Sequence, residues 1–132
     1  MSGTRRRAVI TIGVIAIVIG LAGSLNGATS PVFEVPGRSL FRFMAINLFG
    51  GLFSVAVGIL AIVAARRART TLLLWCGAAF VVAALVNLVG IDRSFNVFGG
   101  HASLASVFLC FGTGLVAIAL TPELEAGGAN DA

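Results

Sequence analysis

Long stretches without a charged side chain constrain the fold of this chain more than any other feature. Three of them run from Ala8 to Ser30, from Phe43 to Ala65 and from Thr70 to Ile91, and a fourth follows Ser94. Each can supply the roughly 20 residues that a helix needs to cross about 30 Å of hydrocarbon. The strands of a membrane barrel would instead alternate polar and apolar residues, and no stretch here alternates. Four membrane-spanning helices are therefore expected.

Composition supports this assignment, because 11% of the residues are charged and 58% are hydrophobic, whereas soluble domains carry about 25% charged residues. The polar connections are too short to bury a core of their own. The sequence predicts one transmembrane domain over residues 1–132, an all-α, antiparallel four-helix bundle. Its expected spans are about 8–27, 44–65, 71–90 and 102–121.

Most arginines gather at one side of this arrangement. Arg5, Arg6 and Arg7 precede the first span, and Arg66, Arg67 and Arg69 lie between the second and third. The positive-inside rule assigns that side to the cytoplasm, so we expect a multi-pass protein of the cell membrane with both termini cytoplasmic. The net charge of +4 is explained by these clusters, and nucleic acid is not an expected partner. The first span also resembles a signal peptide, but its apolar run is longer than a signal core, which favours a retained helix.

One pentapeptide pattern occurs twice, as "NLFGG" from Asn47 and "NVFGG" from Asn96. Downstream, "GILAIVA" from Gly58 is similar to "GLVAIAL" from Gly114, with about seven more residues between the two motifs in the second copy. Seven residues make about two helical turns, so the insertion preserves the helix face. The pattern predicts two related helical hairpins that enter the membrane in the same direction. It also predicts that Asn96 lies outside the membrane, in water.

Small residues recur every four positions in two of the spans. Because lipid provides little hydrophobic drive between helices, such stripes allow close backbone packing. We expect both stripes in the bundle interior: Gly50, Ser54 and Gly58 in the second span, and Ala102, Ser106, Cys110 and Gly114 in the fourth.

Four asparagines fall on the side opposite the arginine clusters, namely Asn26, Asn47, Asn87 and Asn96. Helix termination is one interpretation, particularly for Asn26, which precedes a glycine. Asn47 and Asn87 lie inside the predicted hydrocarbon boundary, where an amide must find a hydrogen-bond partner. Hydrogen bonds between helices are the expected solution, and a polar substrate site is the alternative.

The sequence contains little that indicates catalysis or cofactor binding. No Asp, Glu, Arg or Lys lies in the middle of a predicted span, which argues against a proton-coupled exporter. His101 is the only histidine, and because bis-histidine ligation requires two, a haem-binding bundle is disfavoured. His101, Asp92 and Glu34 could meet as a metal site, although a solvated loop histidine is the favoured interpretation. No phosphate-binding loop or catalytic motif is present, and we expect neither catalytic residues nor cofactors.

The segments "INLFGGLFSVAVGILAIVAARRAR" from Ile46 and "NVFGGHASLASVFLCFGTGLVAIAL" from Asn96 resemble an uncharacterised family. The chain is similar over about Ala8 to Thr121 to small four-helix membrane proteins of actinobacteria classed as domain of unknown function 4383. Members of that family often place a histidine shortly after each such asparagine. Here "FGG" occupies the first of these two histidine positions, and only His101 corresponds to the second. The resemblance implies a fold and a membrane location, but no activity.

Two functions from different classes remain open. The leading hypothesis is a non-enzymatic integral membrane protein that contacts lipids, other membrane proteins or itself as an accessory subunit. The alternative is a small passive channel or transporter for a polar solute, entered at the asparagines.

Overall fold

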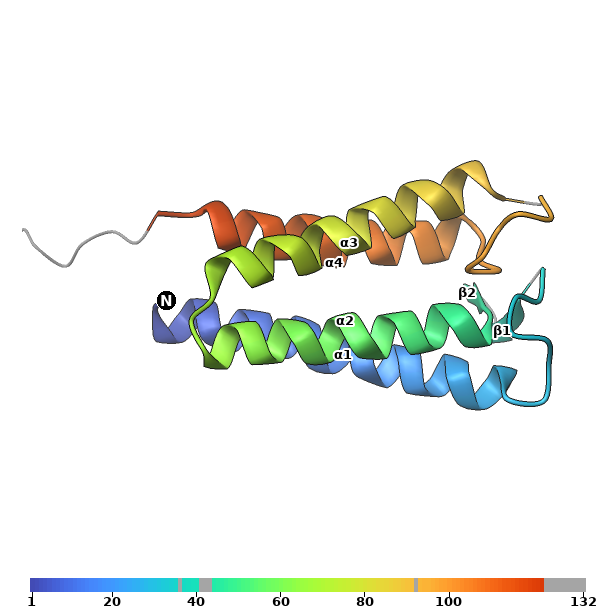
Figure 1. The fold of residues 1–132 in the computed structure, drawn as a ribbon, viewed down its shortest axis with the longest axis horizontal. Coiled ribbons are helices and arrows are strands. Elements are labelled where there is room, and N and C mark those ends of the chain that lie inside the picture. Colours follow the sequence, from blue (N-terminus) through green and yellow to red (C-terminus); the bar gives the residue numbers. More distant parts are fainter. Residues whose placement is uncertain (36, 41–43, 92, 123–132) are drawn as a thin grey trace, which may run out of the picture.

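The computed structural model describes residues 1–35, 37–40, 44–91 and 93–122. This part of the chain forms four long helices, and a two-stranded antiparallel ladder precedes the second of them (Figure 1). In chain order the elements are α1 (Gly3–Gly27), β1 (Arg38–Leu40), β2 (Met44–Ile46), α2 (Leu48–Arg66), α3 (Thr70–Val89) and α4 (Ala102–Leu120).

All four helices are long and apolar enough to cross a membrane, with mean hydropathy from 2.1 to 2.5 over the most apolar window of each. The expected all-α, integral membrane four-helix bundle is thereby confirmed. We call the end with residues 28–47 and 90–101 the loop end. The opposite end, where α1 begins, the α2–α3 turn lies and α4 finishes, is the terminal end (Figure 1).

Two helix boundaries differ from the sequence prediction. α1 begins at Gly3, before the three arginines, because the Ser2 side chain caps it by accepting a hydrogen bond from Arg5 N. The second helix begins later than expected, since Met44–Ile46 is strand β2 and Asn47 is the N-cap of α2. Arginine side chains can extend from an apolar helix toward water, so charge at the start of α1 does not end the helix.

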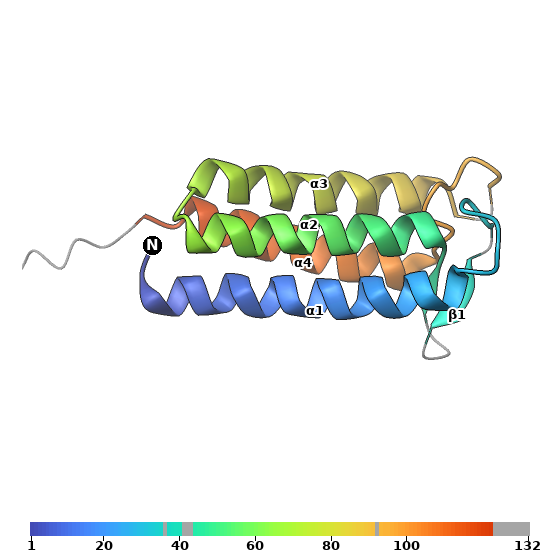
Figure 2. The same ribbon diagram turned by 60° about the horizontal axis from the view of Figure 1, so that its bottom comes forward.

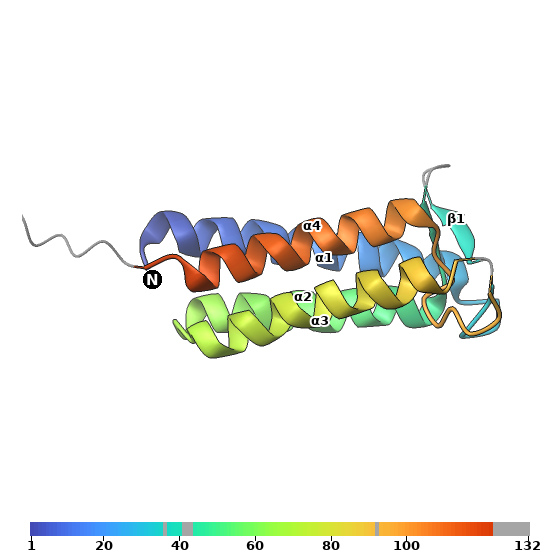
Figure 3. The ribbon, with the colours of Figure 1, turned by 90° about the horizontal axis from the view of Figure 1, so that it is seen from above.

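The helices pair as two hairpins, α1 with α2 and α3 with α4. The two hairpins form two layers (Figure 1), and across them α2 lies beside α3 and α1 beside α4 (Figures 2 and 3). The hairpin architecture expected from the repeated pentapeptide is present. The common origin of the two hairpins stays a prediction.

Reciprocal glycine contacts hold the first hairpin together. A Cβ atom on Gly20 would lie 2.6 Å from Gly51 O, and one on Gly51 would lie 2.7 Å from Gly20 O. Gly13 and Gly58 repeat this relation at 2.9 and 2.8 Å. Between these pairs, Ser54 Oγ donates to Ala16 O at 2.8 Å. These distances are too short for any side chain, so the two backbones are in direct contact.

The predicted stripe of the second span is confirmed as an interior face, because Gly50, Ser54 and Gly58 are all buried. The α1 residues that meet α2, including Gly13 and Gly20, formed no stripe in the sequence prediction. Along α1 these residues are separated by three, four or seven positions, so a search for small residues at every fourth position does not detect them.

The predicted stripe of the fourth span is wrong. Ala102, Ser106 and Cys110 are exposed, and Gly114 is only partly buried. The hydroxyl of Ser106 donates to Ala102 O at 2.9 Å within its own helix, so this small polar side chain needs no partner helix. α4 instead meets α3 at Gly112, where a Cβ atom would lie 2.8 Å from Gly77 O, and the reverse distance is 2.9 Å.

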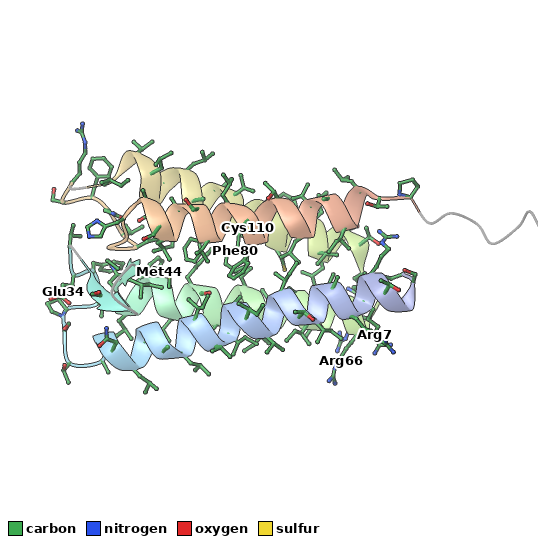
Figure 4. The ribbon with its side chains drawn as sticks, turned by 180° about the vertical axis from the view of Figure 1, so that it is seen from behind. Arg7, Glu34, Met44, Arg66, Phe80 and Cys110 are labelled. Atoms are coloured by element: carbon green, nitrogen blue, oxygen red, sulfur yellow. The ribbon has the colours of Figure 1, made fainter. Side chains whose placement is uncertain are left out.

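Phenylalanine rings fill the space between the two hairpins. Phe80 of α3 lies between the layers (Figure 4), with its ring centroid 5.8 Å from Phe53 of α2 and 5.4 Å from Phe108 of α4. Phe98, from the loop before α4, adds contacts of 5.3 Å to Phe53 and 5.7 Å to Phe108. The rings adopt tilted and edge-to-face arrangements, which aromatic pairs favour. The bundle axis is therefore packed toward the loop end.

Candidate functional site

Hydrogen bonds at the loop end join the two hairpins through Asn47. Its Oδ1 accepts from Gly50 N at 2.8 Å and so caps α2. Its Nδ2 donates to Val97 O at 2.8 Å, and its backbone N–H donates to Phe98 O at 3.1 Å. The side chain is 1% exposed. The Asn47 amide thus forms a bond between hairpins, but its partner is a loop backbone carbonyl, whereas the sequence predicted a partner on a second helix.

The two copies of the pentapeptide touch each other and have different structures. The first begins α2, whereas the second, residues 96–100, is an irregular turn that lies against Asn47. Gly99 has a φ of +60°, a conformation in which a glycine avoids the strain that other residues carry. Its carbonyl accepts from Gly37 N at 2.6 Å. Gly99 of the second pentapeptide therefore joins the loop that precedes α4 to the segment between α1 and α2.

Asn87 and Asn96 are also buried and bonded to loop backbone. Asn87 Nδ2 donates to His101 O at 2.9 Å, while its Oδ1 has no partner among the described residues. Asn96 Nδ2 donates to Gly100 O at 2.9 Å, and its Oδ1 accepts from Phe98 N at 3.3 Å. The expectation that water satisfies Asn96 is wrong, because the side chain is 1% exposed. Asn96 lies outside any helix, yet the turn encloses it.

Asn26 lies in the last turn of α1 and not beyond its end, since the C-cap is Ala28. Its Nδ2 donates to Ser39 O at 3.1 Å, which ties α1 to strand β1. All four predicted asparagines therefore lie at the loop end as expected. Each holds a segment of backbone, and they do not converge on a common cavity.

A polar pocket of about 490 Å³ opens at the loop end beside the second pentapeptide. Two of its side chains are exposed cations or potential cations, Arg93 and His101. His101 precedes α4, and its side chain makes no capping hydrogen bond. The full lining is Phe33, Val35, Arg93, Ser94, Asn96, Gly99, Gly100 and His101. Guanidinium, imidazole and hydroxyl groups together suit an anionic or hydroxyl-bearing ligand.

An apolar groove of about 450 Å³ runs along α3 on the surface that faces lipid. Trp75 lies toward its terminal end and is 70% exposed. At the loop end the groove reaches Val97 and Phe98, on the other side of the turn that borders the polar pocket. Its remaining lining is Phe49, Phe53, Ala78, Ala79, Val82, Ala83 and Val86. Such a surface suits acyl chains or an apolar helix.

The metal alternative receives no support in the described residues, where no three His, Cys, Asp or Glu side chains lie close enough to hold an ion. His101 lines the polar pocket and Glu34 does not. Asp92, the third residue of that alternative, lies outside the described residues. Cys76 is buried and Cys110 is exposed, both as free thiols.

The sequence prediction named two residues that line the pocket, Asn96 and His101, but none of the groove residues. It assigned no role to Arg93, although this residue lies three positions before the second pentapeptide. The pocket and the groove both depend on loop conformation, because the 96–100 turn brings the Phe98 ring against α2 and leaves Arg93 at the edge of the pocket.

The fold and this site define the class: a four-helix integral membrane protein made of two glycine-packed hairpins, joined at one end by interlocked loops. No family model, curated protein or solved structure matches the chain. Membership of domain of unknown function 4383 therefore stays a prediction from the two segments that resemble it.

Proposed function

We propose that this protein is a non-enzymatic accessory component of the cell membrane that acts by contacting lipids, other membrane proteins or a second copy of itself. The observation that carries the proposal is the distribution of its surfaces. The axis between the hairpins is filled by rings such as Phe80 and Phe108, whereas the hollows lie outside, along α3 and at the loop end. A protein with such surfaces is suited to contact at its periphery.

The same packing argues against the passive channel. Asn47 and Asn87, the suggested entry residues, are 1% and 0% exposed and donate to backbone carbonyls. A path through the bundle would have to displace Phe98, which is 5% exposed, and then the rings below it. Solute flux is therefore not the function we propose.

We test the contact function with a photo-reactive amino acid in place of Val82, which lies in the α3 groove. Val18 on α1 is a matched control, because the two valines are 58% and 57% exposed and both lie about 10 to 13 Å from the loop end of their helices. We expect adducts of defined mass at Val82 in native membranes and only random lipid adducts at Val18. Solute flux that appears in vesicles only with the protein would overturn the proposal.

Orientation is part of the proposal, with the terminal end in the cytoplasm because six of the nine arginines lie there. In a cysteine-free background, Ser39→Cys or Ser94→Cys should react with an impermeant maleimide added to intact cells. Thr70→Cys, equally solvent-exposed at the other end, should react only after the membrane is opened. The reverse labelling pattern would invert the orientation.

A further inference from the structure

We propose that the α3 groove and the loop-end pocket together hold one anionic phospholipid from the leaflet at the loop end. Its acyl chain would lie in the groove, and its phosphate would lie at Arg93. This inference rests on the proposed contact function and names the ligand of that contact.

The groove fits an acyl chain because its surface is almost entirely apolar and open to lipid. It extends along α3 from Trp75, past Val82 and Val86, to Phe98 at the loop end. A headgroup does not fit there, since the indole N–H of Trp75 is the one polar side-chain group in its lining and polar groups without partners are costly at that depth.

The groove continues toward the loop end into a second, smaller hollow of about 300 Å³. Val86 lines both spaces, and Phe95 forms the far wall of the smaller one. The guanidinium carbon of Arg93 lies 5.9 Å from the centroid of the Phe95 ring. An apolar path thus leads from the middle of α3 to a cation at the membrane boundary.

Arg93 is also a lining residue of the polar pocket, together with Ser94 and His101. It therefore connects the apolar path to a polar space that can hold a headgroup. A guanidinium binds phosphate oxygens in a bidentate manner, and the positive end of the α4 helix dipole favours negative charge as well.

Charge complementarity favours this occupant over the other candidates. The described lining of the pocket contains Arg93 and His101 and no carboxylate. Free phosphate would fill the pocket but leave the groove open to random lipid. An apolar partner helix would cover the groove without using the cation at its end. A phospholipid satisfies both surfaces with one molecule.

The experiment places the photo-reactive amino acid at Val82 of the full chain, in vesicles of phosphatidylcholine with a small share of phosphatidylglycerol. Mass spectrometry of the adducts identifies the lipid. We expect the phosphatidylglycerol share at Val82 to exceed its share in the bilayer about fivefold, the effect of one arginine near a membrane surface. At the matched position Val18, the share should equal that of the bilayer.

Arg93 variants test the phosphate contact. Arg93→Gln should return the adducts at Val82 to the bilayer composition, and Arg93→Lys should keep most of the enrichment. Arg66→Gln removes the same charge at the terminal end and should change nothing at Val82. Arg93 is exposed, so these variants should fold.

Three results would overturn the inference: bilayer composition at Val82 in the unmodified background, enrichment that survives Arg93→Gln, or an adduct with protein in native membranes at the expense of lipid. The last would leave the contact function standing with a different occupant. Protein-dependent solute flux, measured separately, would instead remove the contact function itself.

Discussion

Helices within a hairpin and helices of different hairpins meet in opposite ways. In each hairpin, glycines bring the two backbones together, as at Gly20 with Gly51 and Gly77 with Gly112. Between the hairpins, rings such as Phe53 and Phe80 keep the backbones apart. Both interfaces are buried, but one is filled by main chain and the other by large side chains.

The difference shows how a short membrane protein can build a stable interior without a hydrophobic force between its helices. Lipid is as apolar as the side chains, so association depends on packing and hydrogen bonds. Glycine contacts maximise dispersion between backbones, whereas rings fill a wider space with specific aromatic geometry. Substitutions that add volume should therefore disrupt the interface within a hairpin. Substitutions that remove volume should disrupt the interface between the hairpins.

The largest effect is expected from Gly58→Leu. A Cβ atom there would lie 2.8 Å from Gly13 O, and a backbone carbonyl cannot move aside as a side chain can. We expect a loss of about 3 kcal/mol, the upper part of the range for overpacking. Gly114→Leu is the matched control, because the nearest atom to its Cβ would be Ile12 Cδ1 at 3.5 Å. Equal losses in detergent unfolding would contradict the glycine interface.

The joint between hairpins at the loop end should be next in size. Asn47→Leu removes the cap of α2 and leaves Val97 O without its donor, for which about 1 to 3 kcal/mol is expected. Asn96→Leu should cost a similar amount, since both ends of its amide are bonded and buried. Unfolding in detergent measures both. A negligible cost at Asn96 would mean that water reaches this amide.

Phe80→Leu tests the aromatic layer itself. The substitution keeps an apolar side chain but removes ring contacts to Phe53, Phe108 and Phe111. We expect a loss of about 1.5 kcal/mol, the lower end of the range for three aromatic pairs. Phe95→Leu is the control, because that ring is 53% exposed and lies outside the layer. A thermal unfolding series that ranks Phe95→Leu as the more damaging variant would refute this account.

The smallest effect compares two serines that make hydrogen bonds of similar length. Ser54 Oγ donates to Ala16 O of the neighbouring helix at 2.8 Å, whereas Ser106 Oγ donates within α4 at 2.9 Å. Ser54→Ala should cost about 0.6 kcal/mol, the mean for interhelical bonds in a membrane. Ser106→Ala should be close to neutral. Detecting this difference requires equilibrium unfolding, and a larger cost at Ser106 would place α4 differently in the bundle.

The spans were readable from the sequence because they depend on properties summed over many residues. Twenty apolar residues in succession define a helix whatever its neighbours are, and all four predicted helices finish within one residue of the observed C-terminal ends, although the first two begin four or five residues away from their predicted starts. The stripe of Gly50, Ser54 and Gly58 was also identified, since repeated glycines and serines in a span have few uses other than close packing.

The positions that depend on a neighbour were not readable. Whether Ser106 faces lipid or protein is decided by which side of α4 meets α3, and both sides of α4 are apolar enough for either. The roles of Asn47 and Asn96 depend on the 96–100 turn, which encloses the Asn96 side chain and brings backbone carbonyls to Asn47. That turn forms because two loops far apart in the chain pair their backbone groups, as Gly37 N does with Gly99 O. The sequence by itself determined that four helices cross a membrane and where they end. Only the tertiary structure decided which faces meet and that Arg93 stands at the end of a groove, because those facts depend on contacts between residues that no local pattern connects.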